Sequence, residues 1–463
     1  MTIQPTSLLR CISPIDGSVF AERPALSADA AREVVADARK AQKDWAKVAL
    51  EDRIKLVLAG IDQLAAVNED VTVELAHMMG RPVRHGGEFG PIRERADYMA
   101  SIAPDALAPK VIESSDAFER TLAREPQGLV LVIAPWNYPY LTALNTIVPA
   151  LMAGNSVLIK HAEQTLLVGE RIAAAFHRAG LPEALVANIF LDHPTAETLL
   201  GEGHFDAVNF TGSVEGGRRV ERAAAGTFTA MTFELGGKDA AYVMEDADLD
   251  AAAAHLVDGA LYNSGQCCCG IERIYVTEQH YDAFIDKAIK AAGDYTLGNP
   301  LDPETVIGPM AHERFARTVR AHVDEAVAAG AKTHLAPSPA DDGGAYVSPQ
   351  ILTNVDHSMQ VMREETFGPV VGIMKVKDDA QAIDLMNDTD YGLTASLWTQ
   401  NADRAAQSGA ELENGVVFMN RCDYVDPALC WAGCKNTGRG GTLSELGFLA
   451  LTRTKSYHLR KQM

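Results

Sequence analysis

Short apolar runs alternate with helical stretches over residues 128–213, and this alternation limits the possible folds more than any other feature of the chain. Four runs are typical of buried strands: Gly128–Asn137, Asn155–Lys160, Ala184–Phe190 and Phe205–Phe210. Glu163–Ala179 has the apolar spacing of a helix, and another helix is expected from about Ser213. This order predicts a parallel sheet with helices on both faces, an architecture that holds nucleotides at the carboxyl ends of its strands.

A second α/β unit is expected from about Asp239 onward. Its strands are predicted at Glu272–Glu278, Pro369–Val376 and Leu393–Thr399. A helix between them has apolar side chains on one face, at four-residue spacing: Phe315, Val319, Val323 and Val327. The Ala-, Leu- and Glu-rich composition of residues 26–79 predicts further helices, and 463 residues are enough for two or three domains.

The charge of the chain argues against two classes of partner. A formal net charge of −21 repels nucleic acid and anionic membrane surfaces over most of the protein. No segment reaches the ~18–20 consecutive apolar residues of a membrane span, and Met1–Pro14 lacks the charged and apolar regions of an export signal. We therefore expect no nucleic-acid or membrane partner, and a cytoplasmic location.

The seven cysteines agree with that location and raise a chemical question. They are clustered and odd in number, unlike a disulfide framework, and lie at Cys11, Cys267, Cys268, Cys269, Cys422, Cys430 and Cys434. Side chains of consecutive residues diverge, unlike the paired ligands of a zinc site, so no metal is expected. A thiolate adds readily to a carbonyl carbon, but the residues alone do not say which of the three consecutive thiols reacts.

Six motifs occur in an order that identifies a family, although a G-x-G-x-x-G motif is missing from the first expected strand. They are PWNYP (Pro135–Pro139), IKHAEQT (Ile159–Thr165), FTGS (Phe210–Ser213), FELGGKD (Phe233–Asp239), NSGQCCCG (Asn263–Gly270) and EETFGPV (Glu364–Val370). Through these motifs the chain resembles the NAD(P)-dependent aldehyde dehydrogenase superfamily, from about Ser13 to the TRTKS near its C-terminus.

The resemblance implies a fold and a division into domains. A Rossmann-like parallel-sheet NAD-binding domain is expected in residues 1–107 and 127–236, and a second α/β catalytic domain in residues 237–437. Residues 108–126 and 438–463 are expected to form a small β oligomerisation arm and a C-terminal tail. By the same analogy the protein is expected to be a homodimer or a homotetramer, since relatives extend such an arm to a neighbouring subunit.

The resemblance also implies three catalytic residues. The family's N-x-G-Q-x-C pattern makes Cys268 the nucleophile, and the side-chain amide of Asn137, with the backbone N–H of Cys268, would stabilise the oxyanion. Glu234 would activate the water that hydrolyses the thioester on Cys268. Relatives that transfer the acyl group to coenzyme A resemble NLGGK at this place, so the ELGGK of this chain implies a free carboxylic acid as product.

For the cofactor, the resemblance implies NAD, with NADP as the other possibility. The expected cofactor-binding residues are Trp136, Lys160, Glu163, Gly212, Ser213, Leu235, Glu365 and Phe367. A helix N-terminus at Ser213 attracts the pyrophosphate, and a carboxylate at Glu163 accepts from both ribose hydroxyls but repels a 2′-phosphate. His161, together with Lys160, would soften that repulsion.

The substrate is expected to be a small polar aldehyde or a semialdehyde. Thr142 and Asn145 lie at i, i+3 on one face of an expected helix, where relatives that take long apolar aldehydes have bulky hydrophobes. Arg421 is a candidate anchor for a substrate carboxylate, and it has Asp423 or Asp426 as alternative partners. Tyr138 and Trp431, together with Tyr424, are candidates for the wall of the pocket.

Two other functions remain possible at this point. A cysteine-dependent (thio)esterase would use Cys268 with a paired histidine, but none of the thirteen histidines lies in a recognisable partner motif. A non-enzymatic structural protein of the same fold would lack at least one catalytic group, whereas Asn137, Glu234, Cys268 and Glu365 are all present.

Overall fold

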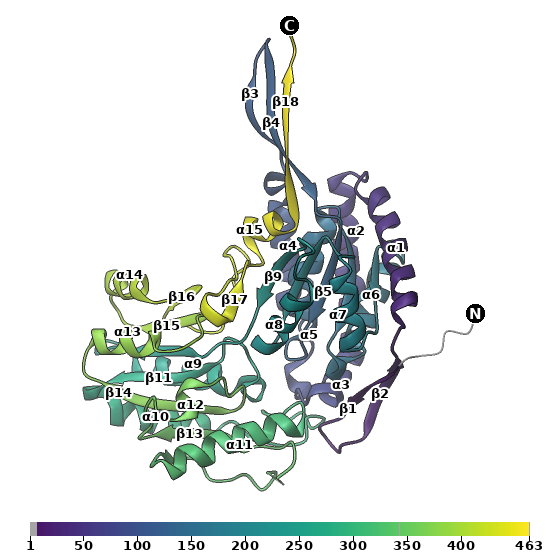
Figure 1. Ribbon diagram of the computed structural model, residues 1–463. Helices are drawn as coiled ribbons and strands as arrows, with labels where there is room; N and C mark the ends of the chain where they lie inside the picture. The colour runs from purple at the N-terminus through teal and green to yellow at the C-terminus, as the bar shows by residue number, and fades with distance from the viewer. Residues whose placement is uncertain (1–6, 342, 463) are drawn as a thin grey trace.

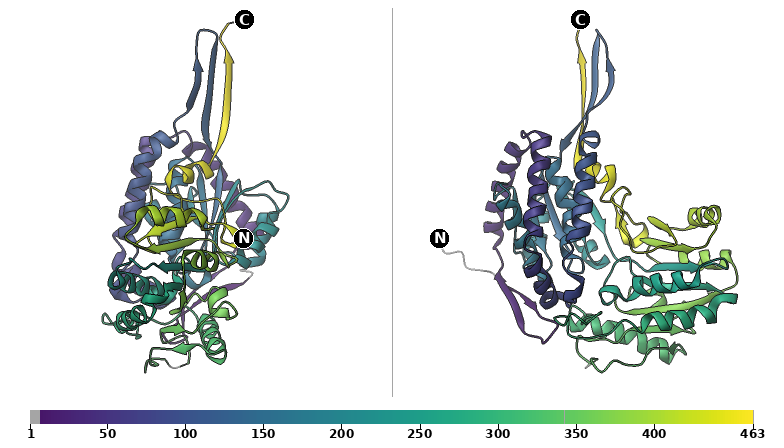
Figure 2. Two further views of the ribbon diagram at one scale, coloured as in Figure 1. Left: turned by 90° about the vertical axis from the view of Figure 1, so that its left-hand side faces the viewer. Right: turned by 180° about the vertical axis from the view of Figure 1, so that it is seen from behind.

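Two α/β units and a projecting three-stranded arm make up the computed structural model, which describes residues 7–341 and 343–462 (Figure 1). Met1–Thr6, with which the segment examined for an export signal begins, lie outside the described residues. The two units lie side by side, and the C-terminal segment from β17 to α15 runs along the first unit on the side that faces the second (Figures 1 and 2). The parallel-sheet α/β fold expected from the sequence is confirmed.

The first unit is built on a six-stranded sheet of order β17-β9-β8-β5-β6-β7. All neighbouring strands are parallel except β17, which is antiparallel to β9. The strands are β5 Leu129–Ala134, β6 Ser156–His161, β7 Val186–Asn188, β8 Ala207–Thr211, β9 Ala230–Glu234 and β17 Gly438–Arg439. Because β17 comes from the C-terminal segment, that segment contributes to this sheet as well as to the arm.

Helices cover both faces of this sheet because alternate residues of its strands are apolar on both sides. Val130 and Val132 of β5 belong to the core under α2 to α6, whereas Leu129 and Leu131 belong to the core under α1, α7 and α8. The helices are α1 Ala28–Trp45, α2 Leu50–Ala65, α3 Asn68–Met79, α4 Phe89–Ala106, α5 Pro139–Met152, α6 Val168–Arg178, α7 His193–Gly201, α8 Val214–Ala223 and α15 Ser444–Ala450.

The second unit contains a seven-stranded sheet of order β12-β13-β14-β11-β10-β15-β16, parallel except for β12. Its strands are β10 Asp239–Val243, β11 Ile271–Thr277, β12 Lys332–Thr333, β13 Gln350–Thr353, β14 Val370–Val376, β15 Thr394–Trp398 and β16 Val416–Met419. Its helices are α9 Leu249–Leu261, α10 Tyr281–Ala292, α11 Glu313–Ala328, α12 Gln360–Arg363, α13 Asp379–Asn387 and α14 Ala402–Glu411. One core lies between the sheet and α9 with α10, and another lies between the sheet and α11 to α14.

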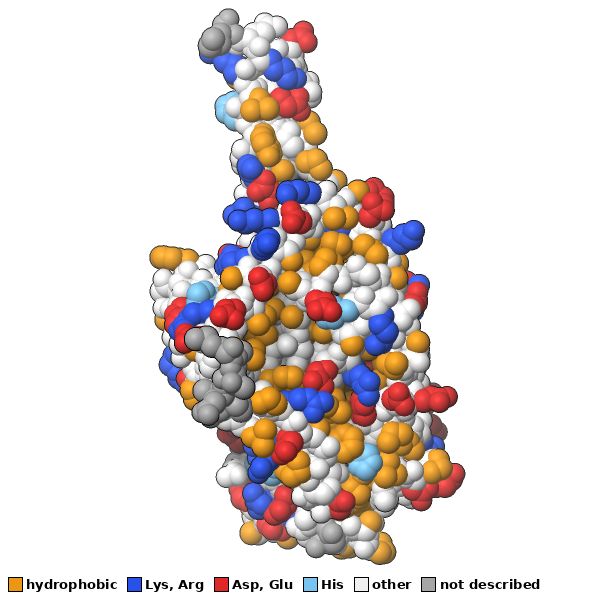
Figure 3. All heavy atoms as spheres, turned by 90° about the vertical axis from the view of Figure 1, so that its right-hand side faces the viewer, with side chains coloured by type: hydrophobic (Ala, Val, Ile, Leu, Met, Phe, Trp, Pro, Cys, Tyr) orange, Lys and Arg blue, Asp and Glu red, His pale blue; other side chains and the backbone are white. Residues whose placement is uncertain are grey.

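The arm is a three-stranded antiparallel sheet of order β18-β4-β3 that extends away from both units (Figure 2). Its strands are β3 Lys110–Ser114, β4 Phe118–Pro126 and β18 Thr452–Arg460. The register joins the two distant segments along their whole length, from Thr452 opposite Pro126 to Arg460 opposite Phe118. Apolar side chains lie among charged ones on the arm (Figure 3), and the exposed large hydrophobic residues there include Val111, Ile112, Tyr457 and Leu459.

The remaining elements connect these parts. An antiparallel hairpin of β1 Leu8–Ile12 and β2 Val19–Pro24 lies near the N-terminus. Short 3₁₀ turns occur at η1 Val83–His85, η2 Glu163–Thr165, η3 Tyr262–Gly265, η4 Glu278–His280 and η5 Lys435–Thr437. None of the helices within the described ranges combines the length and the hydropathy needed to span a bilayer.

The structure differs from one predicted helix in where that helix begins. Glu163–Ala179 was expected to be one helix, but residues 163–165 form the 3₁₀ turn η2, and α6 starts only at Val168. Two buried side chains of the turn are fixed from outside it: Gln164 donates to the Ile12 carbonyl, and Thr165 contacts the ring of His161. These contacts hold residues 163–165 in a separate turn at the end of β6, and Glu163 therefore lies at the carboxyl edge of the sheet.

Candidate active site

The segment before the three cysteines has a left-handed backbone. Asn263, Ser264 and Gly265 have φ values of 53°, 57° and 67°, and such a conformation costs a residue other than glycine about 1–2 kcal/mol. Side chains within the segment offset this cost. Asn263 Nδ2 donates to the Gln266 carbonyl at 3.3 Å, and Ser264 Oγ donates to the Gly308 carbonyl at 2.8 Å. The turn therefore has a single well-defined shape that presents the cysteines at its end.

A buried arginine joins this turn to the start of α5. Arg81 donates through Nη2 to the Asn137 carbonyl at 2.9 Å and through Nε to Asn263 Oδ1 at 3.3 Å. Its charge is balanced by Glu88, 2.7 Å away, which also accepts from the Leu141 backbone N–H at 2.6 Å. Burial raises the pKa of Glu88, and the Arg81 charge opposes that rise. This network fixes the backbone of Asn137 relative to the turn of residues 263–265.

Asn137 faces the three cysteines. Its Nδ2 donates to the Gln266 carbonyl at 3.2 Å, so its amide lies beside the residues that immediately precede the thiols. Gln266 is itself fixed, since its Oε1 accepts from the Ala311 backbone N–H at 2.8 Å. Asn137 is thus brought against the segment that precedes Cys268, from a position far apart in the sequence.

The three thiols form one interacting group. Cys267 and Cys268 are half-buried, Cys269 is buried, and the sulfurs of Cys267 and Cys269 are 3.4 Å apart. Hydrogen bonds from the other two thiols lower the pKa of Cys267. The hydrogen bond to Cys267, together with burial, raises the pKa values of Cys268 and Cys269. Because the three titrate together, the first thiolate belongs to the group rather than to one sulfur.

The two glycines of ELGGK bring this motif against the Cys268 backbone and the EETFGPV loop. A Cβ on Gly237 would lie 2.4 Å from the Cys268 carbonyl oxygen, and one on Gly236 would lie 2.3 Å from Glu365 Oε2. The Gly237 N–H donates to Glu365 Oε1 at 2.9 Å. No side chain fits at either position, so glycine is required for the two loops to approach this closely.

Glu234 lies at the end of β9, in a buried position with two hydroxyl donors. Thr442 donates to its Oε1, and Thr211 donates to its Oε2 at 3.2 Å. Burial raises the pKa of Glu234, and these two hydrogen bonds oppose the rise. Thr442 also exchanges both backbone hydrogen bonds with Trp431, at 2.9 and 3.0 Å, which connects the base to a candidate pocket residue.

A second buried acid, Glu272, shapes the loop that contains Glu365. It accepts from the backbone N–H groups of Thr366 and Phe367 at 2.9 and 2.8 Å, and it is paired with the buried Lys238. Among the described residues no ion pair to Glu365 is formed, and burial, together with the negative charge of Glu272, raises its pKa to about 8.

The amino end of α8 and an adjacent cavity are suited to a dinucleotide. Ser213 is the N-cap, with its Oγ accepting from the Gly216 N–H at 3.2 Å, and it is exposed. A cavity of about 190 Å³ runs along α8 to the segment 435–439 and is lined by Leu235 and by the charged side chains of Arg218, Glu221, Lys435 and Arg439. Arg439 is paired with Glu221 and Lys435 with Glu413, and no ion pair to Arg218 is formed among the described residues. Free N–H groups and nearby cations of this kind attract phosphate.

Lys160, His161 and Glu163 lie at the carboxyl end of β6 and in the turn that follows it. Glu163 is exposed, and its Oε1 accepts from the Arg10 N–H at 2.8 Å. His161 is buried, with its ring between the Pro139 carbonyl and the Thr165 hydroxyl, and burial lowers its pKa to about 4. The expectation that His161 would soften repulsion of a phosphate was wrong, because a neutral inward-facing ring supplies no charge at that edge.

Two candidate cofactor residues, Trp136 and Phe367, belong to a group of three aromatic rings. Trp136 stacks on Phe315 with ring centroids 4.7 Å apart, and it meets the Phe367 ring edge-on at 5.5 Å. Two of these three rings come from motifs found in the sequence, whereas Phe315 comes from α11 and was expected only as part of an apolar helix face.

The substrate candidates separate into an inner and an outer set. Asn145 and Trp431 are buried, and Tyr138 lies under the Arg81 guanidinium at 4.8 Å. The Thr142 hydroxyl donates to the Tyr138 carbonyl at 2.8 Å, so its hydrogen bond is made within α5. Arg421 is exposed and stacks over the Tyr424 ring at 3.8 Å.

Neither alternative acidic partner of Arg421 is confirmed. The described residues include no side-chain hydrogen bond or ion pair between Arg421 and Asp423 or Asp426. Tyr424 itself donates to Glu94 at 2.8 Å, which joins this loop to α4.

Sequence reasoning missed the residues that support the site from a distance. Arg81, Glu88, Glu272 and Thr442 lie outside the six motifs or were not singled out, and each contacts a motif residue. The sequence marks Arg81 only as part of a turn after a helical stretch. Their function depends on contacts between distant segments, which local patterns do not contain.

Comparisons with known proteins agree with this geometry. The model of the aldehyde dehydrogenase family matches residues 3–457. The NAD(P)+ succinate semialdehyde dehydrogenase Sad of Escherichia coli is 31% identical over 450 residues, which cover 96% of this chain and 97% of that protein.

Two solved structures are also similar. The NADP-dependent glyceraldehyde-3-phosphate dehydrogenase of Bacillus halodurans, complexed with NADP, has a TM-score of 0.92 and 31% identity, and the match covers 99% of this chain and 96% of that one. The NAD-dependent aldehyde dehydrogenase of Sinorhizobium meliloti also has a TM-score of 0.92 and 31% identity, with 99% and 92% covered.

Proposed function

The chain belongs to the aldehyde dehydrogenase family, and from that premise we propose that it oxidises a small polar aldehyde or a semialdehyde through Cys268, Asn137 and Glu234. The reaction class is that of the family, NAD(P)-dependent oxidation of an aldehyde to a carboxylic acid. The observation that supports the residue roles best is the convergence of the three motifs: Asn137 bonds to Gln266, and Gly237 lies against the Cys268 carbonyl.

The first step proposed is attack by the Cys268 thiolate on the aldehyde carbon. The carbonyl π electrons move to oxygen, and the resulting oxyanion accepts hydrogen bonds from Asn137 Nδ2 and the Cys268 N–H. Loss of one such donor costs about 10²–10³ in rate. Asn137 Nδ2 donates to the Gln266 carbonyl, so its amide is held against the segment that leads into Cys268.

The cofactor, when bound, accepts the hydride that leaves the substrate carbon. The residues proposed to hold it fit a dinucleotide: an exposed helix N-terminus at Ser213, a cavity with basic side chains along α8, and Glu163 at the sheet edge. Phe367 and Trp136 are proposed to lie beside the nicotinamide, with Glu365 on the adjacent ribose.

Glu234 is proposed to act in the second half of the reaction. A thioester on Cys268 is hydrolysed when Glu234 removes a proton from an attacking water, and the acyl–sulfur bond then breaks to release the acid and the thiolate. A buried carboxyl with a raised pKa is a stronger base than an exposed one once it is ionised. The hydroxyls of Thr442 and Thr211 favour the ionised form.

Trapping the acyl-enzyme tests the nucleophile. The protein is incubated with an aldehyde and the oxidised cofactor, quenched in acid, digested and analysed by mass spectrometry, with Cys268→Ala as the matched variant. We expect the acyl group on Cys268 and none on the variant. An acyl group on Cys267 or Cys269 would reject Cys268 as the nucleophile, and no acyl group on any cysteine would reject the covalent mechanism.

We propose that NAD is preferred to NADP. Glu163 is the supporting residue, because an exposed carboxylate at the ribose edge repels a 2′-phosphate, and His161 is too buried to offset it. The ratio of kcat/KM for the two cofactors, measured for the parent and Glu163→Gln, tests this. In the variant, kcat/KM with NADP should rise relative to kcat/KM with NAD. A parent that prefers NADP would contradict the proposal.

The domain division, the location and the assembly state are proposals of the same kind. Residues 1–107 and 127–236 are proposed to bind the cofactor, residues 237–437 to carry the nucleophile, and residues 108–126 and 438–463 to form the arm and tail, with β17 added to the first sheet. The unpaired edges of the arm and its exposed apolar residues support a homodimer or homotetramer. Seven free cysteines support a cytoplasmic location.

A thioesterase without the cofactor is less well supported. Such an enzyme needs a base paired with the thiol, and no histidine ring in the described residues is hydrogen-bonded to Cys267, Cys268 or Cys269. Glu234 with its two hydroxyl donors is the base that the structure offers near this group.

A further inference from the structure

Arg95 is an arginine of the candidate active site that has no acidic partner. It lies on α4, and its Nη1 donates to Asn145 Oδ1 on α5 at 3.0 Å. Among the described residues this is its only side-chain hydrogen bond, and no ion pair to it is formed. A guanidinium has five N–H donors in a planar fork, so most of the hydrogen-bonding capacity of Arg95 is available to another group.

The nearby carboxylates already have other hydrogen-bond partners. Glu88 is bonded to Arg81 and the Leu141 N–H, Glu94 accepts from Tyr424, and Glu234 accepts from two threonines. Arg93, on the same helix, shows the usual alternative, because it is exposed and paired with Asp62 and Asp97. A partly buried cation without a counterion is unfavourable unless an anion arrives to pair with it.

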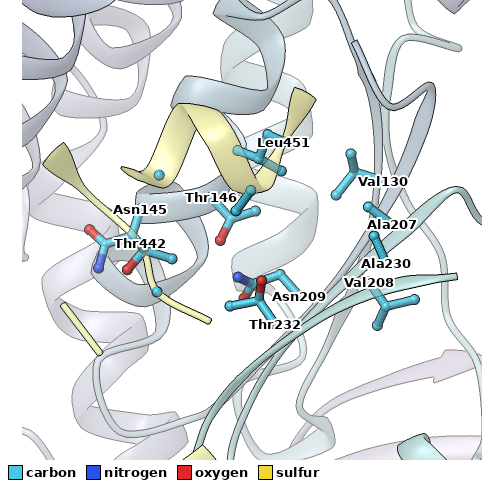
Figure 4. Close-up of a pocket in the computed structure, with 13 residues that line it drawn as sticks. Val130, Asn145, Thr146, Ala207, Val208, Asn209, Ala230, Thr232, Thr442 and Leu451 are labelled. Carbon is cyan, nitrogen blue, oxygen red and sulfur yellow. The ribbon is translucent and has the colours of Figure 1, made fainter. Parts of the chain in front are cut away.

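The surroundings of Arg95 lead to Glu234 through neighbouring residues. Arg95 and Asn145 line a cavity of about 10 Å³ together with Leu443, the residue after Thr442, and Thr442 donates to Glu234. Burial lowers the pKa of Arg95, whereas the Cys269 thiol and the Glu234 carboxyl oppose that fall. Its partner Asn145 also lines the cavity shown in Figure 4, together with Thr442, the donor to Glu234. The preceding turn of α5, at Leu141 and Thr142, is half-buried, so this part of the helix is not closed to solvent.

We propose that Arg95 binds the carboxylate of an ω-carboxy aldehyde, with Asn145 holding its guanidinium in place. This inference rests on the proposed function and names its substrate class: an aldehyde group and a carboxylate joined by a short chain. Arg95 suits this role better than Arg421, which is exposed and stacked on Tyr424. A carboxylate that pairs bidentately with Arg95 would replace the missing counterion and direct the other end of the substrate toward the thiols.

A different role for Arg95 makes a different prediction. If its charge served only to favour the ionised form of Glu234, its removal would slow every aldehyde alike and would move the pH profile of kcat toward higher pH. If it binds substrate, the loss is confined to substrates with a carboxylate, and the pH profile for neutral aldehydes stays in place.

The test compares 4-oxobutanoate with its methyl ester, which has the same chain without the charge. Initial rates of cofactor reduction are measured for the parent, Arg95→Met, Arg95→Lys, the control Arg93→Met on the same helix, and Arg421→Met, which tests the competing anchor. We expect Arg95→Met to lower kcat/KM for 4-oxobutanoate by about 100-fold and for the ester by less than about threefold. Arg95→Lys should retain part of the selectivity, Arg93→Met should retain all of it, and Arg421→Met should not lose the acid selectively.

The ester also reports whether each variant is folded, because its rate does not depend on the proposed contact. Equal losses on both substrates would overturn the inference, as would a selective loss in Arg421→Met instead. A parent that oxidises the ester as well as the acid would also overturn it while leaving the proposed function intact. No oxidation of any aldehyde by the parent would reject the proposed function itself.

Discussion

The turn of residues 263–270 and the loop from Arg421 to Trp431 both contain candidate site residues but are held in different ways. The turn is fixed by buried polar side chains, with Arg81 and Gln266 each bonded to groups from other segments. In the loop, Arg421 and Asp423 are exposed, and the side-chain contacts of Arg421 and Tyr424 are a ring stack and one bond to Glu94. The chemical centre is therefore rigid, whereas much of the substrate wall depends on contacts at the surface.

Replacing Arg81, the buried cation that supports the turn of residues 263–270, should have the largest effect on stability and turnover. Arg81→Met leaves Glu88 buried without its counterion, and breaking a buried pair in this way costs about 3–5 kcal/mol of unfolding free energy. Turnover should fall as well, because the Asn137 backbone loses its anchor. Urea denaturation and steady-state rates measure both, with the exposed Arg84→Met as the control. A variant as stable as the control would show that the network is not what holds the turn.

Glu234→Gln should separate the two halves of the reaction. The amide keeps the shape of the side chain but removes the base, so deacylation should slow by about 10²–10⁴-fold. Rapid mixing should then show one burst of reduced cofactor per active site, followed by very slow turnover. Unchanged steady-state turnover would remove Glu234 from this role and would place the base elsewhere.

The buried acid Glu365 should make stability depend on pH. Its pKa is about 8 in the folded protein against 4.5 for an ordinary glutamate, so the unfolded chain ionises first as pH rises. The loss of unfolding free energy caused by burying Glu365 therefore grows as the pH rises from 4.5, and it reaches its full size above pH 8. Glu365→Gln should therefore be more stable than the parent by on the order of 2–4 kcal/mol at pH 8.5.

This difference should shrink as the pH falls toward 4.5, because both states of the parent then carry a protonated Glu365. Thermal melts across that range measure it, and the exposed neighbour Glu364→Gln is the control. A difference that does not change with pH would mean that Glu365 is already ionised in the folded protein.

The smallest effect is expected in the surface loop. Tyr424→Phe removes the 2.8 Å hydrogen bond to Glu94 but keeps the ring on which Arg421 stacks. The change in unfolding free energy should stay within about 0.5 kcal/mol, as for most surface substitutions, and kcat/KM should change by less than about twofold. A loss of unfolding free energy as large as that of Arg81→Met would contradict the view that the two regions are held differently.

The sequence could predict features that depend on local patterns, but not those that depend on contacts between distant segments. The parallel sheets follow from local apolar runs, and the family motifs contain Cys268, Glu234 and Asn137 because those residues recur with fixed neighbours. Arg81 and Glu272 have no such local signature, since each acts on a segment far away in the chain. His161 was misjudged for the same reason, because its sequence neighbours do not reveal that its ring points into the core.

The two arginines considered for a substrate carboxylate differ in how far the sequence marks them. Arg421 is a candidate anchor from the sequence, whereas Arg95 lies in an ordinary helical pattern between Arg93 and Asp97. Only the packing of α4 on α5 shows that one of these helical arginines is paired at the surface and the other is turned toward Asn145.

The C-terminal segment joins the arm to the residue that donates to Glu234. Thr442, the hydroxyl donor to Glu234, is followed by one short helix and then by the strand that pairs with β4 in the arm. A protein cut before β18 loses the strand pairing that holds this segment in place, and we expect the position of Thr442 beside Glu234 to become less well defined as a result.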